Sequence, residues 1–261
     1  MKKNITHSAD TLIILLRGKR FILKSSKEKL NRNYLVVQLL LTVVLLISIG
    51  CKKSDDNPPP VSANTVTDID GNVYNTITIG TQVWMKENLK TAHYKNGDAI
   101  PTGLDDAQWV ATTSGACAIY EDNSANNTAY GKLYNWYAVV DPRKIAPAGW
   151  HVPTETEWTT LTTFLGGSTT AGGKMKEAGL THWNSPNTGA TNSSGFTGLP
   201  GGDRYPIPSY GNIGIFGYWW STTETFVDDK AELLGVSIYS EQANIYADKK
   251  IWGLSVRCIK D

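Results

Sequence analysis

The sequence predicts one loop-rich domain over residues 66–261, in which short antiparallel strands are combined with one or two short helices, an α+β composition. Three observations carry this prediction. Segments rich in β-branched and aromatic residues occur near 72–85 and again after residue 231, which is typical of strands. A capping signal followed by an apolar stripe begins at Thr154 and indicates a helix. Glycine and asparagine are frequent between these segments, which indicates turns and loops.

Residues 1–50 are predicted to be a signal peptide. Basic residues precede an apolar run of 17 residues, 34–50, that ends in small residues, and this order is typical of secretory signals. The run closes with Ser48-Ile49-Gly50-Cys51, which resembles the lipobox of bacterial lipoproteins, where Cys51 would carry the lipid. A plain transmembrane anchor is the alternative, because the 17 residues of the run approach the length of about 20 apolar residues that a membrane span needs. We favour lipidation, since an anchor needs no cysteine at its outer edge.

Residues 51–65 are predicted to be the lipidated cysteine and a proline-rich linker. Two lysines and then two acidic residues follow Cys51, and this order resembles the surface-export signal of Bacteroidota lipoproteins. Pro58 to Pro60 favour a semi-extended spacer that does not pack. The expected protein is therefore an outer membrane lipoprotein exposed on the cell surface and held to the membrane by its lipid anchor.

Charge and cysteine content limit the partners of the mature chain. Residues 1–50 hold nine of the 25 basic and two of the 24 acidic residues, so the remainder has a net charge of −6. This argues against nucleic acid, because phosphate binding needs clustered cations. Besides Cys51, only Cys117 and Cys258 remain, and an even count in an oxidising compartment predicts a disulfide. Two buried free thiols are the alternative.

The first half of the domain contains strand signals. Residues 72–85 read as a hairpin that turns at Gly80-Thr81. The preceding Asp68, Asp70 and Asn72 lack the glycine spacing and terminal glutamate of a calcium loop. Residues 95–130 are predicted to be loops with a short strand at 117–120. The apolar segment 133–140 is either a buried strand or a short helix, because periodicity does not decide over eight residues.

The segment GWHVPTETEW, residues 149–158, places a histidine, two carboxylates and two tryptophans within ten residues. Thr154 and Glu157 have the T-x-x-E spacing of a capping box, in which each side chain accepts a hydrogen bond from the other's backbone amide. Trp158, Leu161 and Leu165 then form one apolar stripe, and glycines at 166 and 167 end the helix. We interpret the segment as a helix start rather than a catalytic carboxylate pair.

The second half is rich in glycine. A short helix is predicted at 174–178, and residues 184–217 show little regular pattern. Three strands are predicted at 231–239, 243–247 and 252–259.

Six blocks, in order along the chain, resemble the Fibrobacter succinogenes major paralogous domain, a family of bacterial lipoproteins without an established activity. The blocks are 82–89 (QVWMKENL), 130–138 (YGKLYNWYA), 149–158 (GWHVPTETEW), 195–202 (GFTGLPGG), 218–222 (YWWST) and 255–260 (SVRCIK). The segment Val152-Pro-Thr-Glu-Thr-Glu-Trp158 is also similar to a signature of the formylglycine-generating domain. That likeness implies a C-type-lectin-like α+β fold with many loops and paired terminal strands.

The chain lacks the residues that carry the chemistry of formylglycine-generating enzymes and of sugar-binding C-type lectins. Formylglycine-generating enzymes bind copper through a pair of cysteines, and Cys117 and Cys258 do not stand in that motif. Calcium-dependent sugar-binding lectins carry Glu-Pro-Asn or Gln-Pro-Asp triplets, which are absent here. No cofactor is therefore expected. Calcium stays open, because loop carbonyls and scattered Asp or Asn residues can bind it without a motif.

Aromatic side chains are the remaining candidates for binding. Tyr205, Tyr210, Trp219 and Trp220 flank a glycine-rich loop, and flat rings with polar tips suit stacking on sugars. The competing interpretation is that these rings fill the core of a loop-rich domain. The favoured function is a non-catalytic binding or adhesion module for glycan or a surface protein. An oxidase related to the formylglycine-generating enzymes and a purely structural envelope protein are the alternatives.

Overall fold

The computed structural model describes residues 11–16, 19–24, 64–205, 210–227 and 229–261. The chain divides into two units, residues 1–58 and 59–261, which we describe separately. In the first unit β1 (Thr11–Leu16) pairs antiparallel with β2 (Lys19–Lys24). The predicted apolar run and Cys51, and nearly all of the linker, lie outside the described residues, so lipidation stays a prediction. Among the described residues, no helix is long and apolar enough to cross a bilayer.

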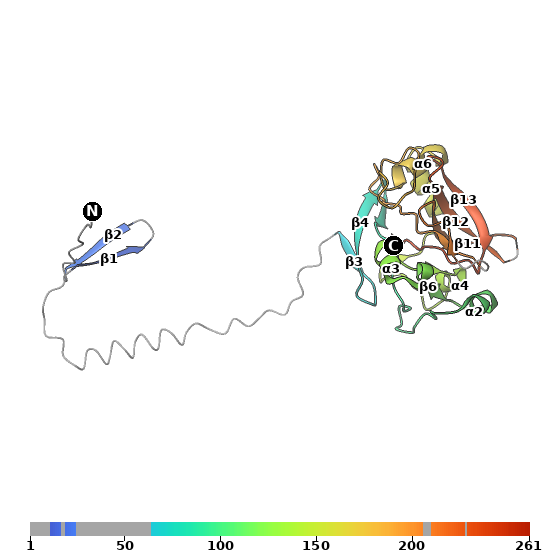
Figure 1. The fold of residues 1–261 in the computed structure, drawn as a ribbon, viewed down its shortest axis with the longest axis horizontal. Helices are drawn as coiled ribbons and strands as arrows, with labels where there is room; N and C mark the ends of the chain where they lie inside the picture. The colour runs from blue at the N-terminus through green and yellow to red at the C-terminus, as the bar shows by residue number, and fades with distance from the viewer. Residues whose placement is uncertain (1–10, 17–18, 25–63, 206–209, 228) are drawn as a thin grey trace, which may run out of the picture. The chain divides into compact units, whose positions relative to one another are not determined.

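The second unit is built on antiparallel sheets (Figure 1). The five-stranded sheet has the order β3-β4-β5-β14-β8, with strands Thr65–Thr67, Val73–Ile79, Gln82–Met85, Ile259–Lys260 and Trp150–His151. The three-stranded sheet contains β11 (Phe216–Glu224), β12 (Lys230–Ser237) and β13 (Ala243–Lys249). Two small pairs join β6 (Cys117–Ala118) to β7 (Leu133–Tyr134) and β9 (Asp203–Arg204) to β10 (Tyr210–Gly211). The described part of the unit is therefore an α+β domain, as the sequence predicts.

The described helices are more numerous than the one or two predicted. They are α2 (Asp106–Ala111), α3 (Ser124–Tyr130), α4 (Trp136–Val139), α5 (Glu155–Phe164) and α6 (Ser168–Met175), with a 3-10 turn at Tyr120–Asp122. The first two lie in the polar segment predicted to be loop. Asp105 caps α2 in a capping box with Gln108, and Asn123 caps α3. These caps satisfy orphan amides that a short helix cannot satisfy by itself.

The elements with strong local signals form where the sequence predicts them. The hairpin β4–β5 turns between Ile79 and Gln82, and the capping box of Thr154 and Glu157 starts α5. Segment 133–140 contains both a strand and a short helix, the two structures that the sequence left open. Asn135 follows β7, and its Oδ1 accepts a hydrogen bond from the Ala138 amide, which starts α4. The predicted helix 174–178 is wrong, since α6 ends at Met175. Of the predicted strand 252–259, only Ile259 lies in a strand of more than one residue, β14.

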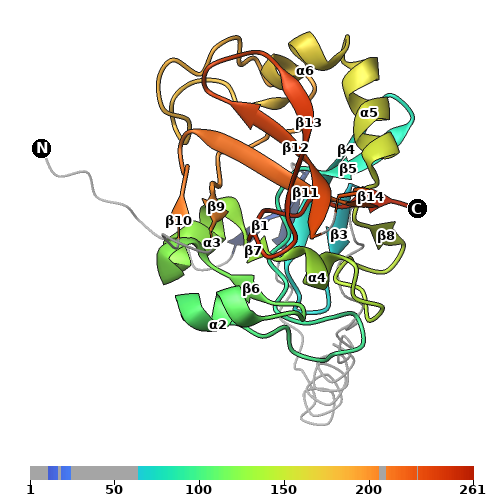
Figure 2. The ribbon, with the colours of Figure 1, turned by 90° about the vertical axis from the view of Figure 1, so that its right-hand side faces the viewer.

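The core lies on both sides of the three-stranded sheet. Because neighbouring side chains of a strand point to opposite faces, Trp219 and Trp220 enter separate clusters. Trp219 packs with Trp84, Trp158 and the residues of α5 and α6, and Figure 2 shows these helices beside the sheet. Trp220 packs toward α4 and β7. All three hydrophobic clusters lie between residues 66 and 259, so this unit has its own core and is expected to fold alone.

The predicted disulfide between Cys117 and Cys258 is not formed. Both cysteines are free, fully buried and part of the same apolar cluster around Tyr134. Burial raises the pKa of both thiols, which suppresses the reactive thiolate. The structure thus matches the alternative of two buried free thiols. A free cysteine packs in a core as a small apolar side chain, so an even number of cysteines does not require a bridge.

Candidate functional site

Two of the four aromatic residues predicted to bind a ligand are core residues. Trp219 and Trp220 have no exposed surface. Their indole N–H groups donate to Asn88 Oδ1 and to the Tyr134 carbonyl, both at 2.8 Å. A ligand cannot reach either ring, so their assignment to a binding site is wrong and the core interpretation holds for both.

Tyr210 and Tyr205 are both half-buried but differ in their surroundings. The Tyr210 ring packs against Tyr120, 5.2 Å between centroids, and beneath the guanidinium of Arg204. Its role is packing around this arginine. The Tyr205 ring meets Trp252 edge-on at 4.6 Å between centroids. Tyr205 therefore borders a second aromatic side chain that is also only half-buried.

One face of the three-stranded sheet carries further aromatic rings. Phe216 and Tyr218 are two residues apart on β11, so they share a face, and their rings stack at 5.3 Å with an interplanar angle of 7°. Tyr246 on β13 reaches the same face. A Cβ atom at Gly235 of β12 would lie 2.9 Å from the Tyr246 ring and 3.0 Å from the Tyr218 ring. Glycine at this position is what lets both rings lie over the middle strand.

We call this surface the aromatic platform. Its members come from β11, from β13 and from three connecting segments, and they are half-buried or exposed: Tyr205, Phe216, Tyr218, Tyr239, Tyr246 and Trp252. Between them lies a pocket of about 180 Å³ lined by Tyr218, Leu233, Tyr246, Ala247, Asp248, Trp252 and Leu254. Exposed fractions of 64% for Tyr239 and 50% for Tyr246 show that ring surface faces solvent.

Two carboxylates lie close to the platform. Asp248 lines the pocket, and burial raises its pKa. Burial also raises the pKa of Asp203 to about 6, against hydrogen bonds that favour the ionised form. The Asn212 amide donates to Asp203 Oδ2 at 2.8 Å and to the Tyr205 hydroxyl. This bridge fixes the Tyr205 ring at its polar end, so the ring is held beside Trp252 before any ligand arrives.

Sequence reasoning found Tyr205 but missed Tyr218, Tyr246 and Trp252. The spacing of Phe216 and Tyr218 by two residues is the signal that could have indicated an aromatic strand face. Nothing local in the sequence shows that Trp252 lies beside Tyr205, because 46 residues separate them.

The platform lies within a region that a family comparison covers. The family model of the Fibrobacter succinogenes major domain matches residues 77–260. The chain belongs to this family. No curated protein and no solved structure matches the chain. The matched region of this family member also contains the segment GWHVPTETEW, in which His151 precedes the capping box.

His151 joins two acidic residues. Its Nε2 lies 2.8 Å from Glu157 Oε1, in the capping box, and its Nδ1 lies 2.7 Å from Asp261 Oδ1. Burial disfavours the charged ring, but the two hydrogen bonds outweigh it and raise the pKa of His151. The carboxylates occupy opposite ring nitrogens, so they cannot share a metal with it. In the described part of the chain, no three side chains are grouped as metal ligands. Calcium binding stays a prediction.

We expect replacement of His151 by glutamine to reduce stability more at pH 6 than at pH 9. Because the folded pKa lies above the ordinary value of 6.5, the stabilisation is complete below 6.5 and is lost as the pH rises through the folded pKa. The effect should stay below about 1 kcal/mol, since the side chain is 39% exposed. Urea unfolding of both proteins at the two pH values measures it. Asp261→Asn should weaken the pH dependence, and a gap that does not change with pH would contradict this assignment.

Proposed function

We propose that the domain is a non-catalytic binding or adhesion module that recognises glycan chains through the aromatic platform. The observation that carries this proposal is the set of solvent-facing rings over one sheet face, with a pocket between them. We further propose that a lipid on Cys51 displays the module on the outer membrane of a bacterial cell, with residues 51–65 as a spacer.

The chemistry of the platform suits sugar rings. The C–H faces of a sugar can lie on flat rings, which offer apolar area at little conformational cost, while tyrosine hydroxyls and Asp248 offer polar contacts. The pocket is smaller than the roughly 300–1,000 Å³ typical of drug-sized ligands, so it fits about one sugar ring. Phe216 and Tyr239 extend the aromatic surface beyond the pocket, which favours a chain over a single sugar.

The C-type-lectin-like fold belongs to the same proposal. Its supporting observation is that β14, near the carboxyl end, lies between β5 and β8. Strands from the two ends of the folded unit therefore meet in one sheet. The oxidase alternative gains no support from the cysteines, because both thiols are buried.

The test is a screen of residues 59–261 against plant, algal and host polysaccharides, with and without calcium. Trp252→Ala and Tyr246→Ala should each weaken the affinity for a hit by about 10- to 100-fold, as buried anchors of an interface do. Gly235→Ala should also weaken it, because the new methyl group displaces two rings. Phe226→Ala is the matched control, since Phe226 is exposed and lies outside the platform.

Two outcomes would contradict the proposal. Binding that survives both ring removals would place the glycan elsewhere. Failure to bind any polysaccharide would remove glycan as the ligand class and leave a surface protein as the partner to seek.

A further inference from the structure

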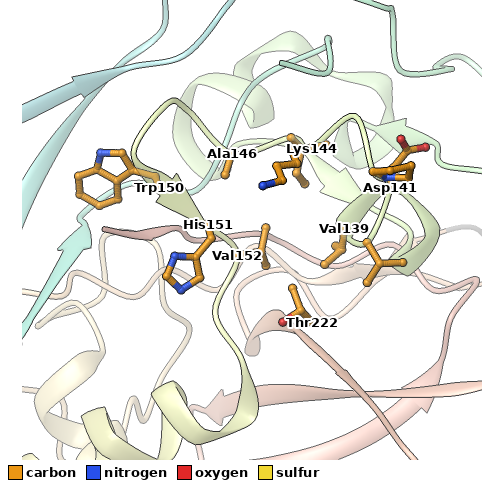
Figure 3. Close-up of a pocket in the computed structure, with 11 residues that line it drawn as sticks. Val139, Asp141, Lys144, Ala146, Trp150, His151, Val152 and Thr222 are labelled. Atoms are coloured by element: carbon orange, nitrogen blue, oxygen red, sulfur yellow. The ribbon is translucent and has the colours of Figure 1, made fainter. Parts of the chain in front are cut away.

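A second and larger cavity lies apart from the platform and shares no residue with its pocket. It has a volume of about 370 Å³ and opens between α4, the turn after it, β8 and Thr222 of β11 (Figure 3). Its floor consists of Val139, Ile145, Ala146 and Val152, each at most 5% exposed, and Trp150 stands at its side. A volume of this size and an apolar lining are typical of small-molecule sites.

The cavity has three charged or titratable side chains, and two of them are already engaged. Both Asp141 carboxylate oxygens accept hydrogen bonds from Arg143, from Nε at 2.9 Å and Nη2 at 2.8 Å. Both ring nitrogens of His151 face carboxylates. The ammonium of Lys144 has no ion pair or hydrogen bond within the described parts of the chain, and Figure 3 shows this side chain pointing into the cavity. Lys144 is therefore the one uncommitted charge.

The backbone of the turn does not require a lysine at this place. Lys144 has a φ of 60°, in the left-handed region where glycine and asparagine are favoured. Its amide donates to the Asp141 carbonyl at 2.8 Å, and its carbonyl accepts from the Lys95 amide at 2.7 Å. These bonds fix the backbone of the turn and the direction of the Cα–Cβ bond of Lys144, whose side chain is exposed at the cavity mouth. The lysine thus occupies a backbone position that suits another residue better, and its side chain is directed over an apolar floor.

We propose that this cavity binds a small amphipathic monocarboxylate. The branched aliphatic or aromatic body of the ligand lies on the apolar floor, and its carboxylate accepts a charge-assisted hydrogen bond from Lys144. A single ammonium matches a single negative charge. A phosphate dianion would leave one charge uncompensated beside the carboxylate of Asp141, which is costly in an apolar setting.

The experiment follows the Trp150 indole and the methyl groups of Val139 and Val152 by NMR in isotope-labelled residues 59–261. The probe is 4-methylpentanoate, and its neutral counterpart is 4-methylpentanamide. We expect saturable shifts of these signals with the acid and at least about tenfold weaker binding of the amide. Lys144→Asn should weaken acid binding by about tenfold or more. It should also fold normally, because asparagine tolerates the left-handed backbone.

Two further variants separate the contribution of the Lys144 charge from that of the apolar floor. Lys249→Asn removes the same charge from an exposed position outside the cavity and should leave acid binding unchanged. Ala146→Leu fills the floor while it keeps Lys144, and it should abolish the shifts. Equal binding of acid and amide, or normal acid binding by Lys144→Asn, would overturn the proposal. So would the absence of saturation up to about 10 mM acid, or shifts that map to the platform.

Discussion

Replacement of Arg257 by alanine is expected to lower the free energy of unfolding by about 3–5 kcal/mol, a large share of the roughly 5–15 kcal/mol that is usual for a domain. Arg257 has no exposed surface. Its Nη2 donates to Asn88 Oδ1 at 2.7 Å and Nε donates to the same oxygen at 3.2 Å, while Nη1 donates to the Phe196 carbonyl. Truncation removes this donor from the Phe196 carbonyl, leaves Asn88 Oδ1 with the Trp219 indole N–H as its donor, and opens a cavity.

The charge of Arg257 is compensated without an ion pair. Among the described residues no carboxylate lies within ion-pair distance of it. Its guanidinium instead lies 4.2 Å from the Phe196 ring centroid and 5.6 Å from that of Trp219. Burial lowers the pKa of Arg257 to about 9. The side chain thus joins the loop at Phe196 to the strand segment near the carboxyl end and to Asn88.

Urea unfolding of residues 59–261 measures this effect, with Arg257→Lys and Arg143→Ala as companions. The lysine keeps the charge but cannot span the same acceptors, so we expect an intermediate loss. Arg143 makes its ion pairs at the surface, and its removal should cost much less stability than the removal of Arg257. A loss of under about 1 kcal/mol for Arg257→Ala would show that water or a relaxed loop replaces the guanidinium.

The elements that local chemistry determines could be predicted from the sequence. The hairpin β4–β5 follows from strand residues and a Gly-Thr turn, and α5 follows from a complete capping box. Helices α2 and α3 were missed because they are one or two turns long and polar. Their only local signals are the caps at Asp105 and Asn123, which also occur in plain turns.

The strand β11 shows why the site could be predicted only in part. Tyr218, Trp219 and Trp220 are consecutive, so composition alone does not tell which ring faces solvent. Tyr218 and Trp220 point to one face of the sheet and Trp219 to the other, yet both tryptophans are buried in core clusters and only Tyr218 borders solvent. The register with β12, in which Tyr218 lies opposite Gly235, decides the question. Tyr205, Tyr246 and Trp252 join the platform through tertiary contacts that no local pattern encodes.

Replacement of Lys176 by methionine is expected to destabilise the domain by about 3 kcal/mol or more, the second largest effect that we predict. Lys176 has no exposed surface, and its ammonium donates to three backbone carbonyls. The Nζ–O distances are 2.8 Å to Thr188, 2.7 Å to Ser237 and 2.9 Å to Ser240. Methionine preserves the apolar stem, so the loss reports the three orphaned carbonyls rather than a cavity.

This effect should depend on pH in a defined direction. Burial lowers the pKa of Lys176 from 10.5 to about 8. Between these values the unfolded chain binds more protons than the folded one, so the free energy of unfolding rises with pH. The variant lacks the group, and the stability gap between wild type and Lys176→Met should therefore widen from pH 8 to pH 10. Urea unfolding at several pH values measures the gap, with Lys174→Met as the control for a lysine that reaches only one carbonyl.

The pH dependence of this stability gap also tests whether the Lys176 ammonium holds irregular segments of the fold together. The three carbonyls belong to the loop after α6, to the last residue of β12 and to the turn that follows it, so one ammonium links two irregular segments to the sheet. If the gap stays constant from pH 8 to pH 10, the three carbonyls offset the effect of burial, and the pKa of Lys176 is not lowered in the folded state. A gap that narrows would mean that the charged form is preferred in the folded state. In either case Lys176 would act, like Arg257, as a permanent buried cation that replaces regular hydrogen-bond ladders between loops.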